Sequence, residues 1–172
     1  MIEINEKNII KYSKIYDERN RDTVNELVEK ELNDWLETHR YLDKEQFVKI
    51  GLWKSRRPKK IYESNDALTV REITQFSFST KSERARIECL FVLNGILYPA
   101  ASAILHFAFP DKYPILDLRA LWAIGWIPPR SYNFEFWQMY CDRIKKISEC
   151  VSKDIRTVDK ALWQYSRIHQ TK

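Results

Sequence analysis

The chain has 172 residues, of which 44% are hydrophobic and 13% aromatic, so it is long enough and apolar enough to bury one sizeable core. Its three glycines are too few for an all-β fold with many tight turns, and its three cysteines lack the paired spacing of a zinc site. The net charge of +5 favours an anionic partner without identifying it. We expect a single domain over residues 1–172, with reduced thiols.

The first segment of the chain is charged and contains no apolar stretch of the kind found in signal peptides. The longest apolar run, from Gly95 to Phe109, is interrupted by Pro99 and His106. It is also shorter than the roughly 20 residues that a membrane-spanning helix needs. We therefore expect a soluble, cytoplasmic protein that does not contact a membrane.

Helical signals begin after a polar start. Residues 1–21 predict irregular or loosely helical structure. Thr23 with Glu26, and Asp43 with Gln46, have the spacing of N-terminal capping boxes, and apolar residues at helical spacing follow each pair. Two helices are predicted in this part of the chain.

The next two predicted helices lead into a turn. One helix is expected at about residues 65–76, and Thr80 with Glu83 has the capping spacing for another. Asn94 and Gly95 should end that second helix, because both residue types tolerate left-handed backbone.

An alanine-rich helix is predicted over residues 100–107, with Pro99 in its first turn. It is apolar on almost all sides, which is typical of a central helix covered by its neighbours. Asp117 has the position of an N-cap for the following helix, which Gly125 should end.

Two further helices complete the pattern, one with apolar residues at helical spacing from Trp137 to Val151 and a last one opening at Thr157. No segment shows the alternation of a convincing strand. The sequence therefore predicts an all-α protein of about eight helices.

Four segments of this pattern resemble the helix-hairpin-helix superfamily of base-excision DNA glycosylases: Leu93-Asn94-Gly95-Ile96, Ala100-Ala101, Pro114-Ile115-Leu116-Asp117 and Leu121-Trp122-Ala123-Ile124-Gly125. The resemblance implies a two-lobed helical bundle with a cleft. Its helix-hairpin-helix motif would span about residues 82–109, and its acid-bearing helix about 117–125. Asp117 would lie at the cleft.

The resemblance also implies a chemistry. Backbone amides of the hairpin would hold a phosphate of double-stranded DNA, with a possible bound monovalent cation and no organic cofactor. The expected phosphate-binding residues are Asn94, Gly95, Ile96, Leu97 and Tyr98. The target nucleotide would be flipped out of the duplex, and Asp117 would stabilise positive charge on the sugar as the base leaves. We expect the protein to act as a monomer.

Three positions depart from the family pattern. Leu97 replaces the usual second glycine of the hairpin, and Pro99 stands where bifunctional members have their Schiff-base lysine, so any activity should be monofunctional. Arg119 follows Asp117 closely, where it either binds a phosphate or neutralises the acid. Asp117 can also be a helix cap and nothing more. These departures keep two alternatives open: a catalytically silent DNA-binding module of the same fold, and a helical protein–protein adaptor.

A basic segment over residues 54–60 is a second candidate contact for DNA, because clustered cations neutralise backbone phosphates. Pro58 argues against helix in it. The expected electrostatic contacts are Lys54, Arg56, Arg57, Lys59, Lys60 and Arg119. Lys81, Arg84 and Arg86 would extend the positive stripe. The alternative is a solvated surface loop.

Aromatic side chains supply the remaining candidates. Tyr98, Trp53, Trp122 and Trp126 are candidates for a base pocket or for a wedge in the base stack, although aromatic residues more often pack in cores. Tyr98 is expected to be the least core-like of them, at the tip of the hairpin. No metal-ligand cluster is visible in the sequence.

Overall fold

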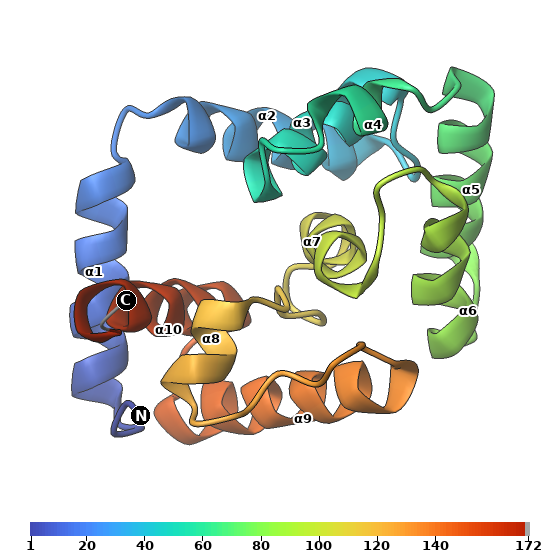
Figure 1. Ribbon diagram of the computed structural model, residues 1–172. Coiled ribbons are helices and arrows are strands. Elements are labelled where there is room, and N and C mark those ends of the chain that lie inside the picture. The colour runs from blue at the N-terminus through green and yellow to red at the C-terminus, as the bar shows by residue number, and fades with distance from the viewer. Residues whose placement is uncertain (171–172) are drawn as a thin grey trace. The chain divides into compact units, whose positions relative to one another are not determined.

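The computed structural model describes residues 1–170, and this part of the chain is entirely helical (Figure 1). It contains ten α-helices and one 3₁₀ helix and no strand, which confirms the all-α prediction. The chain divides into two compact units. We call Asp22–Phe109 the central unit, and Met1–Arg21 together with Pro110–Lys172 the terminal unit.

The central unit is a cluster of short helices around α7. Its elements are α2 (Val24–Thr38), α3 (Lys44–Lys54), α4 (Lys59–Glu63), α5 (Ala67–Ser79), α6 (Glu83–Glu88), the 3₁₀ helix η1 (Cys89–Val92) and α7 (Tyr98–Ala108). Helix α7 packs against α2, α3 and α6. Its residues Ala101, Ala103 and Leu105 are fully buried, because small side chains let neighbouring helices approach closely. The prediction of a central apolar helix is confirmed.

The helix starts in the central unit match the capping signals in part. Thr23 caps α2 by accepting a hydrogen bond from the Glu26 backbone N–H, as the capping-box spacing predicts. The predicted cap of α6 is wrong: Ser82, not Thr80, accepts the hydrogen bond from the Ala85 N–H, at 3.2 Å. Thr80 instead ends α5, and its hydroxyl accepts from the Ser82 N–H at 3.3 Å. Two hydroxyl residues in one short connection made the assignment ambiguous.

The terminal unit combines the two ends of the chain. Its helices are α1 (Glu6–Asn20), α8 (Leu118–Ala123), α9 (Phe134–Val151) and α10 (Ile155–His169). Helix α1 packs along α10, with the rings of Tyr12 and Tyr165 edge-to-face at 5.1 Å between centroids. Helix α10 begins two residues before the predicted Thr157, because Asp154 caps it and accepts the Thr157 N–H at 2.8 Å.

Of the two alternatives expected for residues 1–21, irregular or loosely helical structure, the structure shows a helix over Glu6–Asn20. Asn5 caps α1 by accepting the Asn8 N–H at 2.8 Å, and Ile9 and Tyr12 are buried. These two side chains form a narrow apolar stripe that packs on α10, and the surrounding charged residues conceal it in the sequence. Among the described residues, none of the helices is long and apolar enough to cross a bilayer.

Candidate functional site

The hairpin in the central unit is built on the ring of Tyr62. Gly95 has φ of +85°, and a Cβ atom placed there would meet the Tyr62 ring at 3.0 Å. At the opposite edge of that ring, a Cβ atom at Gly51 of α3 would meet Tyr62 at 2.6 Å. Tyr62 is only 2% exposed, and burial raises the pKa of its hydroxyl. Two of the three glycines of the chain therefore make room for one aromatic ring.

Asn65 ties the hairpin to the end of α4. Its side-chain oxygen accepts the Asn94 backbone N–H at 2.7 Å, and its amide nitrogen donates to the Asn94 carbonyl at 3.2 Å and the Tyr62 carbonyl at 2.9 Å. Inside the turn, the Ile96 N–H donates to the Leu93 carbonyl at 3.1 Å. The N–H groups of Asn94 and Ile96, two of the five predicted phosphate-binding residues, thus already have acceptors.

The remaining amides of the hairpin precede α7. In the described part of the chain, no acceptor is recorded for the backbone N–H of Gly95 or of Leu97. Leu97 is the N-cap residue of α7, with φ of −131°, and its side chain is 68% exposed. Because this backbone is extended, the position does not require the glycine that the family usually has. An apolar side chain therefore stands next to two available amides.

The structure contradicts the exposed position expected for Tyr98. Its side chain is 5% exposed, and its hydroxyl donates to the Glu88 carboxylate at 2.7 Å. Its ring packs edge-to-face on Phe91, with 4.8 Å between centroids. The first turn of α7 points this residue back toward α6, so Tyr98 is a core residue and not a wedge at the hairpin tip.

The basic segment leads directly into the support of the hairpin. Arg56, Arg57, Lys59 and Lys60 are exposed, whereas Lys54 is half-buried at the end of α3. Residues from Lys59 onward form the short helix α4, which the sequence analysis missed, and Pro58 is its N-cap residue. Lys59 forms an ion pair with Glu63 at 3.7 Å. Since α4 also carries Ile61 and Tyr62, the basic segment is attached to the helix on which Gly95 rests.

Trp53 lines a pocket of about 380 Å³ in the same unit. Its indole N–H donates to Glu29 at 3.1 Å, and its ring packs edge-to-face on Phe107 at 5.1 Å. Apolar residues Val24, Val28 and Leu52 line the pocket with cationic residues Lys49, Arg56 and Lys59. Trp53 is half-buried, so one part of the ring packs in the unit and another faces this pocket.

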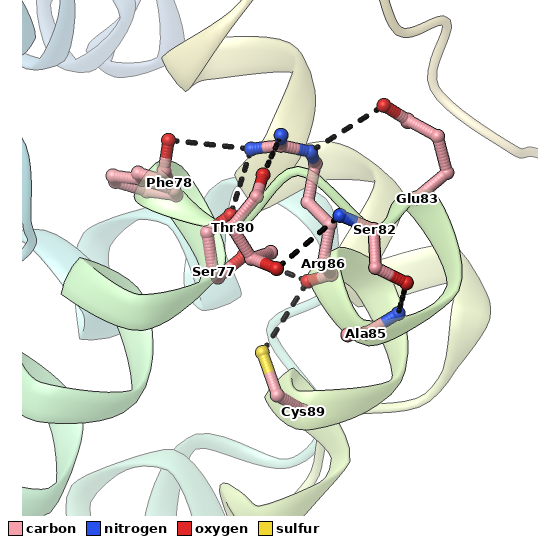
Figure 2. Close-up of polar contacts among 8 residues, drawn as sticks. All are labelled: Ser77, Phe78, Thr80, Ser82, Glu83, Ala85, Arg86 and Cys89. Atoms are coloured by element: carbon pink, nitrogen blue, oxygen red, sulfur yellow. Dashed lines mark hydrogen bonds and ion pairs between the residues drawn. The ribbon is translucent and has the colours of Figure 1, made fainter.

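The extension of the positive stripe to Arg86 is wrong. Arg86 is 8% exposed, and its guanidinium donates to the backbone carbonyls of Ser77 at 2.8 Å, Phe78 at 3.2 Å, and Thr80 (Figure 2). In return, the Ser77 hydroxyl donates to the Arg86 carbonyl at 2.7 Å. The cation therefore stabilises the C-terminus of α5, where unpaired carbonyls concentrate negative partial charge.

Cys89 lies beside this cluster, with its thiol donating to the Arg86 carbonyl at 3.4 Å (Figure 2). Burial raises the pKa of the thiol, which keeps it protonated and unreactive at neutral pH. Arg84, in the first turn of α6, is exposed, unlike Arg86, and forms an ion pair with Glu88 at 2.9 Å.

In the terminal unit, Asp117 is the N-cap residue of α8. Its carboxylate accepts the Arg119 backbone N–H at 2.9 Å, and the residue is half-buried. The capping function that the sequence indicates is confirmed.

Two buried side chains hold the turn before Asp117. The backbone N–H of Ile115 donates to the Asp159 carboxylate at 2.9 Å, and the Ile115 carbonyl accepts from the Tyr140 hydroxyl at 3.0 Å. Burial, with the charges of Asp159 and Asp117, raises the pKa of Tyr140 well above its ordinary value. Burial and the charge of Asp117 likewise raise the pKa of Tyr132.

Sequence reasoning missed these supports, although one signal was present. On α10, the buried residues Ile155, Val158 and Leu162 follow helical spacing, and Asp159 occupies a position on the same face. An acidic residue in an apolar stripe indicates a buried polar partner. No comparable local signal marks Asn65 or Tyr62 in the central unit, because their partners are distant in sequence.

The aromatic candidates of the terminal unit are half-buried and pack on other rings. Trp122 lies 5.9 Å from Tyr165, and Trp126 lies 5.7 Å from Phe136 and 6.5 Å from Tyr140, between centroids. Their function as a base pocket stays a prediction. Arg119 is also placed by a ring: its guanidinium lies 5.5 Å from the centroid of Trp163.

The hairpin offers a poor fit to the monovalent cation that the resemblance implies. Such an ion needs several carbonyl oxygens, and the carbonyls of Leu93 and Asn94 already accept hydrogen bonds from Ile96 and Asn65. No group of three or more acidic, histidine or cysteine ligands occurs in residues 1–170. The cation stays a prediction.

Comparison with known proteins bears on the fold. No protein-family model and no curated protein matches this chain. A solved structure is similar: the Methanocaldococcus jannaschii 8-oxoguanine glycosylase/lyase, in complex with a 15mer DNA containing 8-oxoguanine. The match has a TM-score of 0.51 and 20% sequence identity, and it covers 99% of this chain and 85% of that chain. The chain therefore has the fold of a helical DNA glycosylase.

Proposed function

We propose that this protein binds double-stranded DNA and hydrolyses the N-glycosidic bond of a damaged or modified base. The fold supports the proposal, since the similar structure is a glycosylase bound to DNA. The observation that carries it lies within the central unit. Tyr62 and Asn65 join the hairpin to α4. The available N–H groups of Gly95 and Leu97 and the basic segment therefore lie on two elements that pack against each other.

The hairpin supplies the proposed phosphate contact. The N–H groups of Gly95 and Leu97 precede the eleven-residue helix α7, whose N-terminus carries positive partial charge. Arg56, Arg57 and Lys60 add exposed cations on the segment that leads into the hairpin support. Each phosphate contact of this kind releases counterions, so the binding should weaken steeply with salt.

Asp117 supplies the proposed chemistry. As the bond between sugar and base breaks, positive charge develops on the sugar, and a nearby carboxylate stabilises it. Water adds to the sugar carbon, one of its protons leaves with the base, and an abasic site remains. Pro99 cannot form a Schiff base, so no strand cleavage by a lysine is proposed at that position.

The second candidate is a DNA-binding module without catalysis. Two observations favour it: the carboxylate of Asp117 already caps α8, and the side chain of Leu97 projects beside the amides that would approach a phosphate. This alternative shares the DNA contact and lacks only base release.

Base release by the Asp117→Asn variant tests the catalytic proposal. Asparagine caps helices about as well as aspartate, so α8 should keep its stability while the charge is lost. Incubated with a panel of damaged and modified duplexes, the wild type should produce alkali-labile abasic sites, and the variant should produce at least 100-fold fewer. Equal base release by both, on a duplex that the wild type processes, would refute the catalytic function of Asp117.

Salt-dependent binding separates both candidates from an adaptor. The triple variant Arg56→Gln, Arg57→Gln, Lys60→Gln should reduce the slope of log affinity against log salt by about 3 units. A matched triple variant of other exposed cations in the central unit, Lys30→Gln, Arg40→Gln, Arg71→Gln, removes the same charge and should leave that slope nearly unchanged. Equal slopes for wild type and both variants would contradict the contact.

A further inference from the structure

The terminal unit carries a row of cations ordered on two aromatic rings. The guanidinium groups of Arg119 and Arg167 lie 5.5 and 5.2 Å from the ring centroid of Trp163. The Trp163 ring meets Tyr16 edge-to-face at 5.6 Å, and Arg156 and Lys160 lie 5.4 and 5.7 Å from the Tyr16 centroid. We call these six residues the Trp163 row: Tyr16, Arg119, Arg156, Lys160, Trp163 and Arg167.

Three helices contribute to the row, since Tyr16 is on α1, Arg119 is on α8 and the rest are on α10. All three helices belong to the terminal unit (Figure 1). Asp17 compensates one cation by accepting from Lys160 at 2.7 Å. Arg119 and Arg167 add two further cations to the row. Its members lie at accessible positions, since Arg167 is exposed and the others are half-buried.

Cation–π contact prepares a guanidinium for an oxyanion. The ring attracts the cation through its face and restricts its rotamers, so less entropy is lost on binding. The N–H groups at the edge of the guanidinium plane stay directed outward, where two of them match the two oxygens of a phosphate. Trp163 holds two such groups, which suits a ligand with repeated phosphates better than a single small anion.

We infer that the Trp163 row binds backbone phosphates of DNA, as a contact within the terminal unit separate from the hairpin. The inference rests on the proposed function for its occupant. It assigns Arg119 to phosphate binding, with its guanidinium held by Trp163. An anionic membrane is the weaker occupant, because membrane-surface sites insert apolar and aromatic side chains, and here cations cover the rings.

The test compares two double variants in the full chain by duplex binding between 50 and 500 mM salt. Arg119→Gln with Arg167→Gln should lower the slope of log affinity against log salt by about 2 units and lower affinity at 50 mM salt about 100-fold. The matched control, Arg130→Gln with Arg143→Gln, removes the same charge at exposed positions of the terminal unit with no recorded ring contact in residues 1–170. Its slope should equal that of the wild type.

A third variant tests the ring itself. Trp163→Leu keeps both arginines and should lower affinity about 5-fold with an unchanged salt slope, because preorganisation is lost and the charges remain. Trp163→Phe should restore most of the affinity. Circular dichroism melts verify that each variant is folded, and variants are compared only below their melting temperature.

The outcomes separate this inference from the proposed function. If duplexes are bound with the expected slopes and no base is released, the row stands and the catalytic proposal fails. If the row variant and its control have equal slopes of log affinity against log salt, phosphate binding by the Trp163 row is refuted, and the proposal of base release is unaffected. Absence of salt-dependent duplex binding by the wild type overturns both. Row-dependent binding to phosphatidylserine vesicles, with an unchanged slope on DNA, overturns DNA as the occupant.

Discussion

The hairpin turn of the central unit and the Asp117 turn of the terminal unit are held by similar hydrogen bonds, but a neutral group supports the first and a carboxylate supports the second. In each, side chains hold both the N–H and the carbonyl of a single residue before a helix. Asn65 alone holds Asn94 through its neutral amide. At the second turn, Ile115 is held by the buried carboxylate of Asp159 and the hydroxyl of Tyr140.

The difference matches the ligand charge proposed at each turn. A neutral support under the hairpin adds no repulsion against a phosphate, whereas a carboxylate there would oppose it. At the Asp117 turn, Asp159 adds negative charge where positive charge would develop on a sugar. Burial is the main cause of the raised pKa of Tyr140, and the negative charges of Asp159 and Asp117 raise it further.

The largest expected effect comes from adding a methyl group at the hairpin. Gly95→Ala should lower the free energy of unfolding by about 3 kcal/mol, because it combines a left-handed backbone with a clash against the rigid Tyr62 ring. Urea denaturation measures the loss. Gly125→Ala in the terminal unit is the control: its φ of +77° is similar, but its Cβ would meet the flexible end of Met1 at 3.0 Å. The control should lose about 1 kcal/mol, and equal losses would contradict the importance of the ring.

A smaller effect follows from adding a negative charge to the support of the hairpin and removing the one that supports the Asp117 turn. Asn65→Asp should lower the free energy of unfolding by about 2 kcal/mol, because a carboxylate cannot donate to the Tyr62 and Asn94 carbonyls. The added negative charge should also weaken duplex binding. Asp159→Asn keeps an acceptor for the Ile115 N–H and should cost about 1 kcal/mol, with unchanged duplex binding. Denaturation and binding titrations check both. Stronger duplex binding by Asn65→Asp would contradict the electrostatic comparison.

The smallest effect is a pH dependence confined to the Asp117 turn. The pKa of Tyr140 is raised in the folded state, so its hydroxyl stays protonated while the unfolded chain ionises above its usual pKa of about 10. Its contribution to stability is complete below pH 10 and is lost as the pH rises further. Tyr140→Phe should cost about 1 kcal/mol at pH 7 and should show a shallower loss of stability between pH 10 and 11.5. Parallel curves for variant and wild type would contradict this.

Local signals accounted for much of the fold. The caps at Thr23 and Asp117, the positive φ at Gly95 and the buried alanine-rich helix depend on residues within a few positions of each other. The sequence left α1 open between irregular and loosely helical structure because its apolar stripe is narrow, and α4 was missed because Pro58 and the five cations of residues 54–60 obscure so short a helix. Tyr98 was expected at the surface because of its position at the hairpin tip, and Arg86 because of its charge, but tertiary contacts bury both.

The sequence by itself determined the all-helical class, several helix starts and the position of a carboxylate that caps a helix after an apolar helix, because capping and amphipathic spacing are local properties. Only the tertiary structure decided which groups support the turns: Tyr62 between two glycines, Asn65 on Asn94, and Asp159 with Tyr140 on Ile115. It also decided which cations are structural and which are presented on rings, as with Arg86 and Arg119. These pairings join residues from separate helices, and helical periodicity carries no information about which helix a buried face will meet.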